Sequence, residues 1–100
     1  MAGMPDAYWV NTVREVRDTD RLDAYVRLAG PAIAAAGGTF LARGVPGAAF
    51  EEGSLERTAL IRFDSVDAAV AAYESEAYQA ALDALGEGAV RDVRIIEGLG

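Results

Sequence analysis

Hydrophobic residues gather in four short stretches that predict strands and recur at helical spacing in two longer regions. The four stretches are rich in aromatic and β-branched residues, which favour a pleated, buried backbone. They are Ala7–Val16, Thr39–Arg43, Arg57–Phe63 and Val90–Glu97. The second and third are separated by a loop rich in glycine and proline, so we expect them to pair antiparallel.

The first helical region begins after Asp18–Asp20, whose side-chain oxygens can accept hydrogen bonds from the first free amides of a helix. Gly30-Pro31 predicts a kink or a restart within it, because proline lacks the amide hydrogen. The pair Gly37-Gly38 predicts its end. The second region begins at Asp64 or Ser65, and Ser75 predicts a fresh cap for Glu76–Leu85.

The resulting order, βαββαβ, is typical of a ferredoxin-like α+β fold. We expect a four-stranded antiparallel sheet with two helices on one face. No linker or change of composition divides the chain, which predicts a single domain over residues 1–100 with a loose lead-in at residues 1–6.

The sheet face away from the helices is predicted to be too hydrophobic for contact with water. Alternation in the third strand turns Leu60 and Arg62 to this open face. The first strand is ambiguous, and we place Asn11 on the open face because an amide against apolar helices would lack hydrogen-bond partners. The residues then expected there are Trp9, Asn11, Val13, Leu41, Arg43, Leu60, Arg62, Arg94 and Ile96. We predict that a second copy covers this face, giving a homodimer with a pocket between sheet and partner.

The net charge of the chain argues against some classes of binding partner. The chain has 9 basic and 16 acidic residues and a formal net charge of −7, which argues against nucleic acid and anionic lipid. No apolar stretch approaches the ~20 residues of a membrane span, and the first residues lack the plan of a signal peptide. We expect a cytoplasmic protein with no nucleic-acid or membrane partner.

Several residue types that often serve in catalysis or metal binding are absent from the chain. The chain has no cysteine and no histidine, and every one of its basic residues is arginine. Thiolate nucleophiles, lysine bases and the usual zinc ligands are therefore excluded. We expect no metal and no cofactor, and whether the protein is an enzyme stays open.

Seven polar or aromatic residues are candidates for contact with a ligand, and each also has a structural interpretation. Arg43, Arg62 and Arg94 suit a carboxylate or enolate, or they pair with acidic residues of the chain or its partner. Trp9 and Asn11 can stack and orient a planar substrate, or they are contacts between subunits.

The other two candidates are Tyr73 and Tyr78, which lie on either side of the Ser75 break. Either phenol can act as an acid in a pocket. Alternatively the rings are buried in the core or cover a helix end.

Segments spread over nearly the whole chain together resemble one small bacterial family. They are Tyr8-Trp9-Val10, Asp18–Tyr25, the run from Gly37 to Gly44, Glu52-Gly53, Phe63-Asp64-Ser65, the run from Tyr73 to Tyr78, and Glu97-Gly98. The family is domain of unknown function 1330. The resemblance implies a dimeric α+β barrel, a superfamily of cofactor-free monooxygenases, polyketide cyclases, haem-degrading enzymes and muconolactone isomerases, but no agreed reaction.

The chain departs from the family pattern at three places. Members often have histidine where this chain has Ala36, glutamate where it has Arg62, and a basic residue near Ala84–Leu85. Without histidine to bind iron, the haem-degrading branch is disfavoured.

Two classes of function remain. The chain is expected to bind a small apolar, partly anionic or aromatic metabolite, as a cofactor-independent cyclase, isomerase or oxygenase. The alternative is a non-catalytic ligand-binding or interaction subunit, and the fold alone does not choose between them.

Overall fold

The computed structural model describes residues 5–100, so most of the expected lead-in lies outside it. The elements are β1 (Ala7–Val16), α1 (Thr19–Ala35), β2 (Thr39–Gly44), β3 (Thr58–Phe63), α2 (Val66–Glu74), α3 (Glu76–Leu85) and β4 (Ala89–Glu97). Every predicted strand is present to within one residue at each end. The predicted cap at Ser75 is also confirmed, because its hydroxyl accepts a hydrogen bond from the Tyr78 amide at 3.2 Å.

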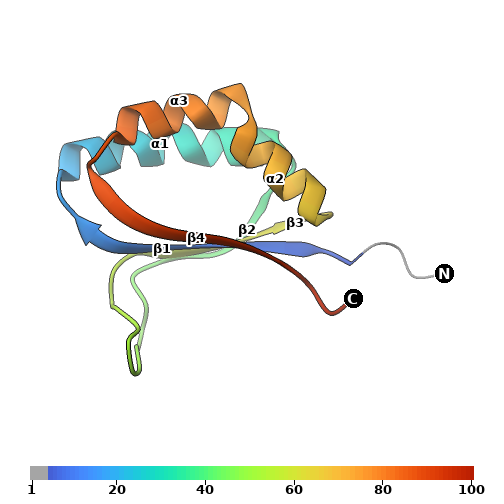
Figure 1. Ribbon diagram of the computed structural model, residues 1–100, viewed down its shortest axis with the longest axis horizontal. Coiled ribbons are helices and arrows are strands. Elements are labelled where there is room, and N and C mark those ends of the chain that lie inside the picture. The colour runs from blue at the N-terminus through green and yellow to red at the C-terminus, as the bar shows by residue number, and fades with distance from the viewer. Residues whose placement is uncertain (1–4) are drawn as a thin grey trace.

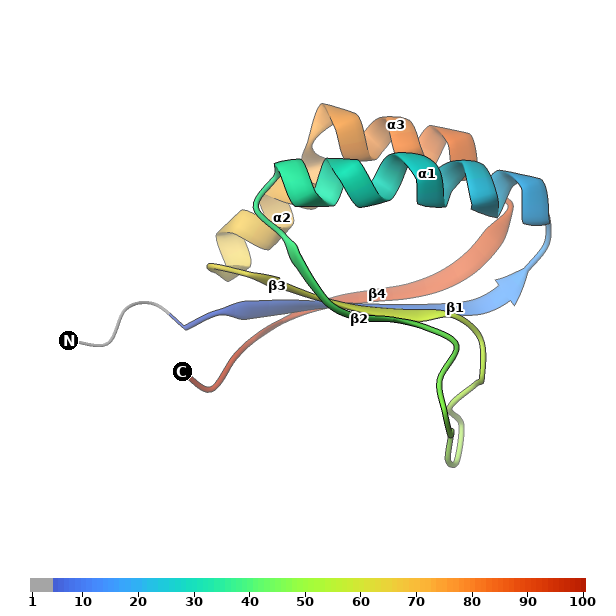
Figure 2. The ribbon, with the colours of Figure 1, turned by 180° about the vertical axis from the view of Figure 1, so that it is seen from behind.

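The strands form one antiparallel sheet in the order β2-β3-β1-β4. All three helices lie on the same face of this sheet (Figure 1). The predicted ferredoxin-like α+β fold is confirmed. No helix of residues 5–100 covers the opposite face, and the loop between β2 and β3 projects on that side (Figure 2).

Helix α1 covers the β2–β3 half of the sheet. Its first turn is capped by Asp18, whose carboxylate accepts from the Arg21 amide at 3.2 Å. The predicted restart at Gly30-Pro31 is wrong, because the helix continues through Pro31 to Ala35. Both Pro31 and Arg27, the residue whose carbonyl would accept the missing hydrogen bond, are exposed, so water can satisfy that carbonyl.

The core lies between sheet and helices and is centred on Trp9, which is fully buried. Its ring stacks on Phe63 at 6.0 Å between centroids and meets Tyr78 edge-on at 5.0 Å. The prediction that Trp9, Asn11 and Val13 face the open side is therefore wrong. Side chains alternate strictly along a strand, so burial of the large Trp9 ring turns Asn11 inward with it.

Gly38 allows α1 to approach the sheet closely. A Cβ atom at this position would lie 2.6 Å from Cγ2 of Ile33 and 2.7 Å from Cζ of Phe63. Only glycine, which has no side chain, fits at this position without displacing its neighbours.

Among residues 5–100, no helix has the length and apolar character to span a membrane.

Candidate functional site

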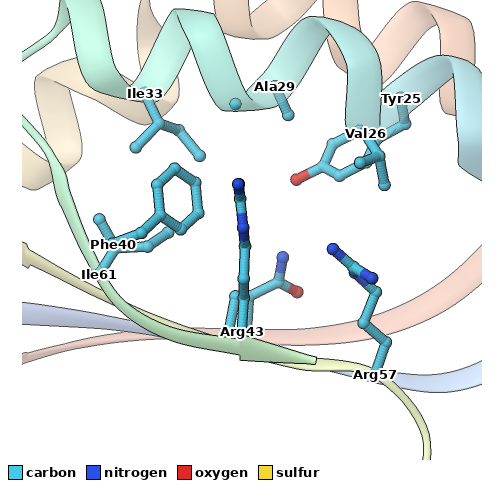
Figure 3. A pocket seen from close by; sticks show the side chains of 11 residues that line it. Tyr25, Val26, Ala29, Ile33, Phe40, Arg43, Arg57 and Ile61 are labelled. Carbon is cyan, nitrogen blue, oxygen red and sulfur yellow. The ribbon is translucent and has the colours of Figure 1, made fainter. Parts of the chain in front are cut away.

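A cleft opens between α1 and the β2–β3 half of the sheet (Figure 3). An inner cavity of about 50 Å³ leads to an outer hollow of about 480 Å³. A second inner cavity, of about 30 Å³, shares several of the same lining residues. A single water needs roughly 10–15 Å³ by this measure, so the inner space suits a small polar group and the outer hollow a larger body.

The walls of the inner cavity are mainly apolar. Val26, Ala29 and Ile33 of α1 lie three or four residues apart and so share one helix face above the cavity. Phe40 of β2 and Ile61 of β3 line it from the sheet. Such walls hold an organic ligand by hydrophobic contact and leave its orientation to the polar groups.

Arg43 enters the cleft because β2 contains a bulge. The ladder to β3 shifts register between Phe40 and Ala42, leaving Leu41 as an extra residue. Arg43 is consequently opposite Ala59, on the helix side of the sheet. Its guanidinium carbon lies 4.6 Å from the centroid of the Phe40 ring. The prediction that Arg43 faces the open side is wrong for this reason.

Arg57 lies at the end of the β2–β3 loop and lines both inner cavities and the outer hollow. Its carbonyl accepts from the Val13 amide at 2.9 Å, which ties the end of the loop to β1. Figure 3 shows the Arg43 and Arg57 side chains rising from the sheet toward α1. Within residues 5–100, no carboxylate lies in salt-bridge distance of either guanidinium.

Two buried tyrosines and one half-buried arginine form a hydrogen-bonded group that borders the cleft. The Tyr25 and Tyr78 hydroxyl oxygens are 2.7 Å apart. Arg91 donates through Nη1 to Tyr25 at 2.8 Å and to Tyr78 at 3.3 Å. Tyr25 and Arg91 line the smaller inner cavity, and Tyr25 also lines the larger one.

The protonation of this group follows from its surroundings. Burial raises the pKa of the Tyr78 phenol, and the neighbouring Tyr25 raises it further, so Tyr78 keeps its proton. Burial alone would lower the pKa of Arg91, but its interactions with the two tyrosines outweigh burial and raise it. Arg91 therefore stays positively charged beside the cleft.

Asn11 lines both inner cavities, opposite α1. Its side-chain oxygen is buried and has no hydrogen-bond partner among residues 5–100. An unpaired buried oxygen costs stability, which makes this atom a candidate acceptor for a ligand.

Arg94 lies on the open face and is already paired with a carboxylate of the chain. It donates to Asp92 through Nε at 3.0 Å and through Nη2 at 3.1 Å, and Arg14 donates to the same carboxylate at 2.9 Å. These hydrogen bonds lower the pKa of Asp92 to about 2. The structural interpretation of Arg94, pairing with a carboxylate of the chain, is thus observed.

The structure divides the seven sequence candidates among three places. Asn11 and Arg43 line the cleft, Trp9, Tyr73 and Tyr78 pack together in the core, and Arg62 and Arg94 lie on the open face. Contact of any of the seven with a ligand stays a prediction.

Sequence reasoning missed Tyr25, Arg57 and Arg91 at the cleft. Tyr25 recurs at helical spacing with the apolar residues of α1, a pattern typical of core positions, and it is indeed buried. Arg91 has the same strand parity as Val93, which faces the helices, and that signal was available. Nothing in the sequence indicates the direction of a side chain at a loop end such as Arg57. No group of three or more metal-ligating side chains occurs among residues 5–100.

Residues 6–99 match the family model described as Domain of unknown function (DUF1330). The chain belongs to this family. No curated protein matches the DUF1330 chain significantly.

Solved structures share the fold of this DUF1330 protein. The RPA0582 protein of unknown function from Rhodopseudomonas palustris is 18% identical, with a TM-score of 0.73 over 98% of this chain and 85% of that one. A dimeric ferredoxin-like protein of unknown function from Thermobifida fusca is 14% identical, with a TM-score of 0.68 over 98% and 95%. SnoaB, a cofactor-independent oxygenase from Streptomyces nogalater, is 14% identical, with a TM-score of 0.63 over 96% and 95%. At these identities the likeness shows the fold alone.

Proposed function

We propose that this protein binds a small organic acid in the cleft between α1 and the sheet. The observation that carries the proposal is the pair Arg43 and Arg57, which face the cleft without a carboxylate partner in residues 5–100. The chain has 16 acidic residues, so carboxylates are not scarce. Both arginines are exposed to solvent where they line the cleft. Two guanidiniums at the same cleft, without a carboxylate partner in the described residues, favour an anionic ligand, which arginine binds with charge-assisted hydrogen bonds.

The size of the cleft indicates how such an acid enters. The inner cavity, at about 50 Å³, suits a small polar group of the ligand rather than a ring. The outer hollow is larger and is lined in part by Val26, Pro31, Ala34 and Phe40, which offer apolar surface to the body of the ligand. Each buried CH₂ group adds about 0.8 kcal/mol. The ligand is therefore an acid with an apolar body.

Binding, rather than a particular reaction, is the function that the cleft supports. The residues lining its inner cavities include arginine, tyrosine and asparagine but no carboxylate. Such a site positions a ligand and stabilises negative charge without a strong base. A cofactor-independent oxygenase, cyclase or isomerase is the catalytic form of this proposal, and a ligand-binding subunit is the non-catalytic form.

We further propose that a second copy covers the open face of the sheet. Ile96 is 61% exposed on this face, and Phe50 is 81% exposed on the loop that projects from the same side (Figure 2). Val10 and Leu60 are direct ladder partners on this face and extend the apolar surface. Each such side chain gains roughly 1.5–3 kcal/mol on full burial. The similar Thermobifida fusca protein is described as dimeric, which supports a homodimer.

The ligand proposal is tested by calorimetric titration with a panel of small aliphatic and aromatic acids, each beside its neutral amide. At least one acid should bind about tenfold tighter than its amide, because hydrogen bonds to charged groups contribute about 1.5–3 kcal/mol. Arg57→Gln should remove that advantage.

The matched control is Arg17→Gln, which makes the same change of charge at an exposed arginine paired with Glu15 at 3.4 Å. This variant should keep the preference for the acid. The proposal is overturned if no acid binds better than its amide, or if both variants lose the preference equally.

A further inference from the structure

The direction of the hydrogen bond between Tyr25 and Tyr78 follows from counting protons. The two oxygens are 2.7 Å apart, and Arg91 contributes only donors to both of them. One hydroxyl proton lies between the tyrosines, so the other proton must point elsewhere. The hydroxyl with access to an acceptor outside the pair is the one that keeps its proton free.

Tyr25 has that access and Tyr78 does not. Tyr78 is fully buried, is absent from the lining of the cleft, and makes no other hydroxyl contact with residues 5–100. Tyr25 lines both inner cavities, and Figure 3 shows its hydroxyl directed into the space below α1. Tyr78 therefore donates to Tyr25, because a buried hydroxyl proton without an acceptor is costly. The Tyr25 proton is left for a group in the cleft.

Asn11 has a hydrogen-bond acceptor, unpaired in the described part of the chain, at the same cavities, which complements the free hydroxyl proton of Tyr25. It lines the same two cavities as Tyr25, and its buried side-chain oxygen lacks a donor within residues 5–100. A single ligand hydroxyl has the chemistry to satisfy both residues, since a hydroxyl can accept from Tyr25 and donate to Asn11. A ketone or an ether only accepts, and an ammonium group only donates.

We infer that the ligand is a hydroxy acid, phenolic or enolic in type, whose hydroxyl lies between Tyr25 and Asn11 while its acid group meets Arg43 and Arg57. This inference rests on the proposed function and adds the chemical class of the ligand. Arg91 and Tyr78 act as positioning residues, because their hydrogen bonds hold the Tyr25 oxygen in place at the edge of the cleft. Their two donated hydrogen bonds also polarise the Tyr25 hydroxyl, which strengthens it as a donor.

The test compares benzoate with its hydroxy and methoxy derivatives, substituted at the ortho, meta or para position, by calorimetric titration of the wild-type protein. The three positions vary the distance between the hydroxyl and the carboxylate. At least one hydroxybenzoate should bind about tenfold tighter than benzoate and than the matching methoxybenzoate, because a methoxy group accepts but does not donate. If Asn11 instead presents its amide nitrogen to the ligand, the methoxy compound binds as well as the hydroxy compound, and the inference is overturned.

Variants assign the two contacts separately. Tyr25→Phe should abolish the advantage of the hydroxybenzoate over benzoate, and Asn11→Leu should abolish its advantage over the methoxybenzoate. Tyr8→Phe, which removes a phenol on the opposite face of β1, should preserve both ratios. Comparing the affinities of two ligands for the same variant cancels any general loss of affinity. The comparison of the three kinds of benzoate on the wild-type protein tests the inference even where a variant fails to fold.

The two proposals fail in different ways. If benzoate binds in an Arg57-dependent manner but a hydroxyl adds nothing at any position, only the hydroxy-acid inference is overturned. If no acid binds better than its amide, the proposed function fails as well.

Discussion

Arg43 lies directly opposite Ala59 across the β2–β3 ladder. Ala59 precedes the buried residue Ile61 by two positions and shares its face, so the Arg43 side chain is directed toward α1. Arg62 has the opposite parity in β3 and lies on the open face. Two arginines that the sequence assigned to one cluster therefore lie on opposite sides of the sheet.

Because the two arginines lie on opposite faces, the same substitution at each shows which face binds the acid. Arg43→Gln should weaken binding of the acid selected from the panel by about tenfold, because it removes a charge-assisted contact in the cleft. Arg62→Gln makes the same chemical change on the other face and should leave the affinity unaltered. Calorimetric titration measures both. A loss of affinity in Arg62→Gln alone would place the acid on the open face instead.

The proposed homodimer predicts a specific dependence on the open face. Sedimentation at micromolar concentration should show a dimer for the wild type and a monomer for Ile96→Asp, because a carboxylate would be buried against apolar surface. Leu28→Asp is the matched control, since Leu28 is 47% exposed on α1, outside the open sheet face. A folded, soluble wild-type monomer at that concentration would contradict the proposal.

Gly38→Ala should destabilise the protein by about 1–3 kcal/mol, because the added methyl group overlaps Ile33 and Phe63. The melting temperature should fall by about 4–8 °C for each kcal/mol in a domain of this size. At Gly47 an added Cβ meets no atom within 4 Å, so Gly47→Ala should change the melting temperature little. Equal melting temperatures for the two variants would show that α1 and the sheet separate at no cost.

Asp92 predicts a pH dependence of stability. Arg94 and Arg14 lower the pKa of Asp92 to about 2, below the value of 3.8 for an unperturbed aspartate. A carboxylate with a lowered pKa stabilises the folded state above the unfolded pKa, and this contribution is lost as the pH falls toward the folded pKa. Asp92→Asn should therefore lose less stability than the wild type between about pH 5 and about pH 2. Urea unfolding midpoints across this range measure the difference, and parallel curves would contradict it.

Local sequence signals determined the elements and their order. The cap residues Asp18 and Ser75 act within one helical turn, and each lies where its side chain accepts the expected amide. Strand composition located all four strands, and the element order implied the βαββαβ topology. The resemblance to DUF1330 drew on the same kind of information, and the family match over residues 6–99 confirms it.

Tertiary structure alone decided which residues meet at the cleft. Both faces of β1 carry apolar residues, so its orientation depended on where the Trp9 ring packs with Phe63 and Tyr78. One extra residue in β2 turned Arg43 to the other face. The contacts of Tyr25 with Tyr78 and Arg91 join positions 53 and 66 residues apart in the chain. Side-chain packing between distant segments creates such relationships, and the spacing of residues along the sequence does not encode them.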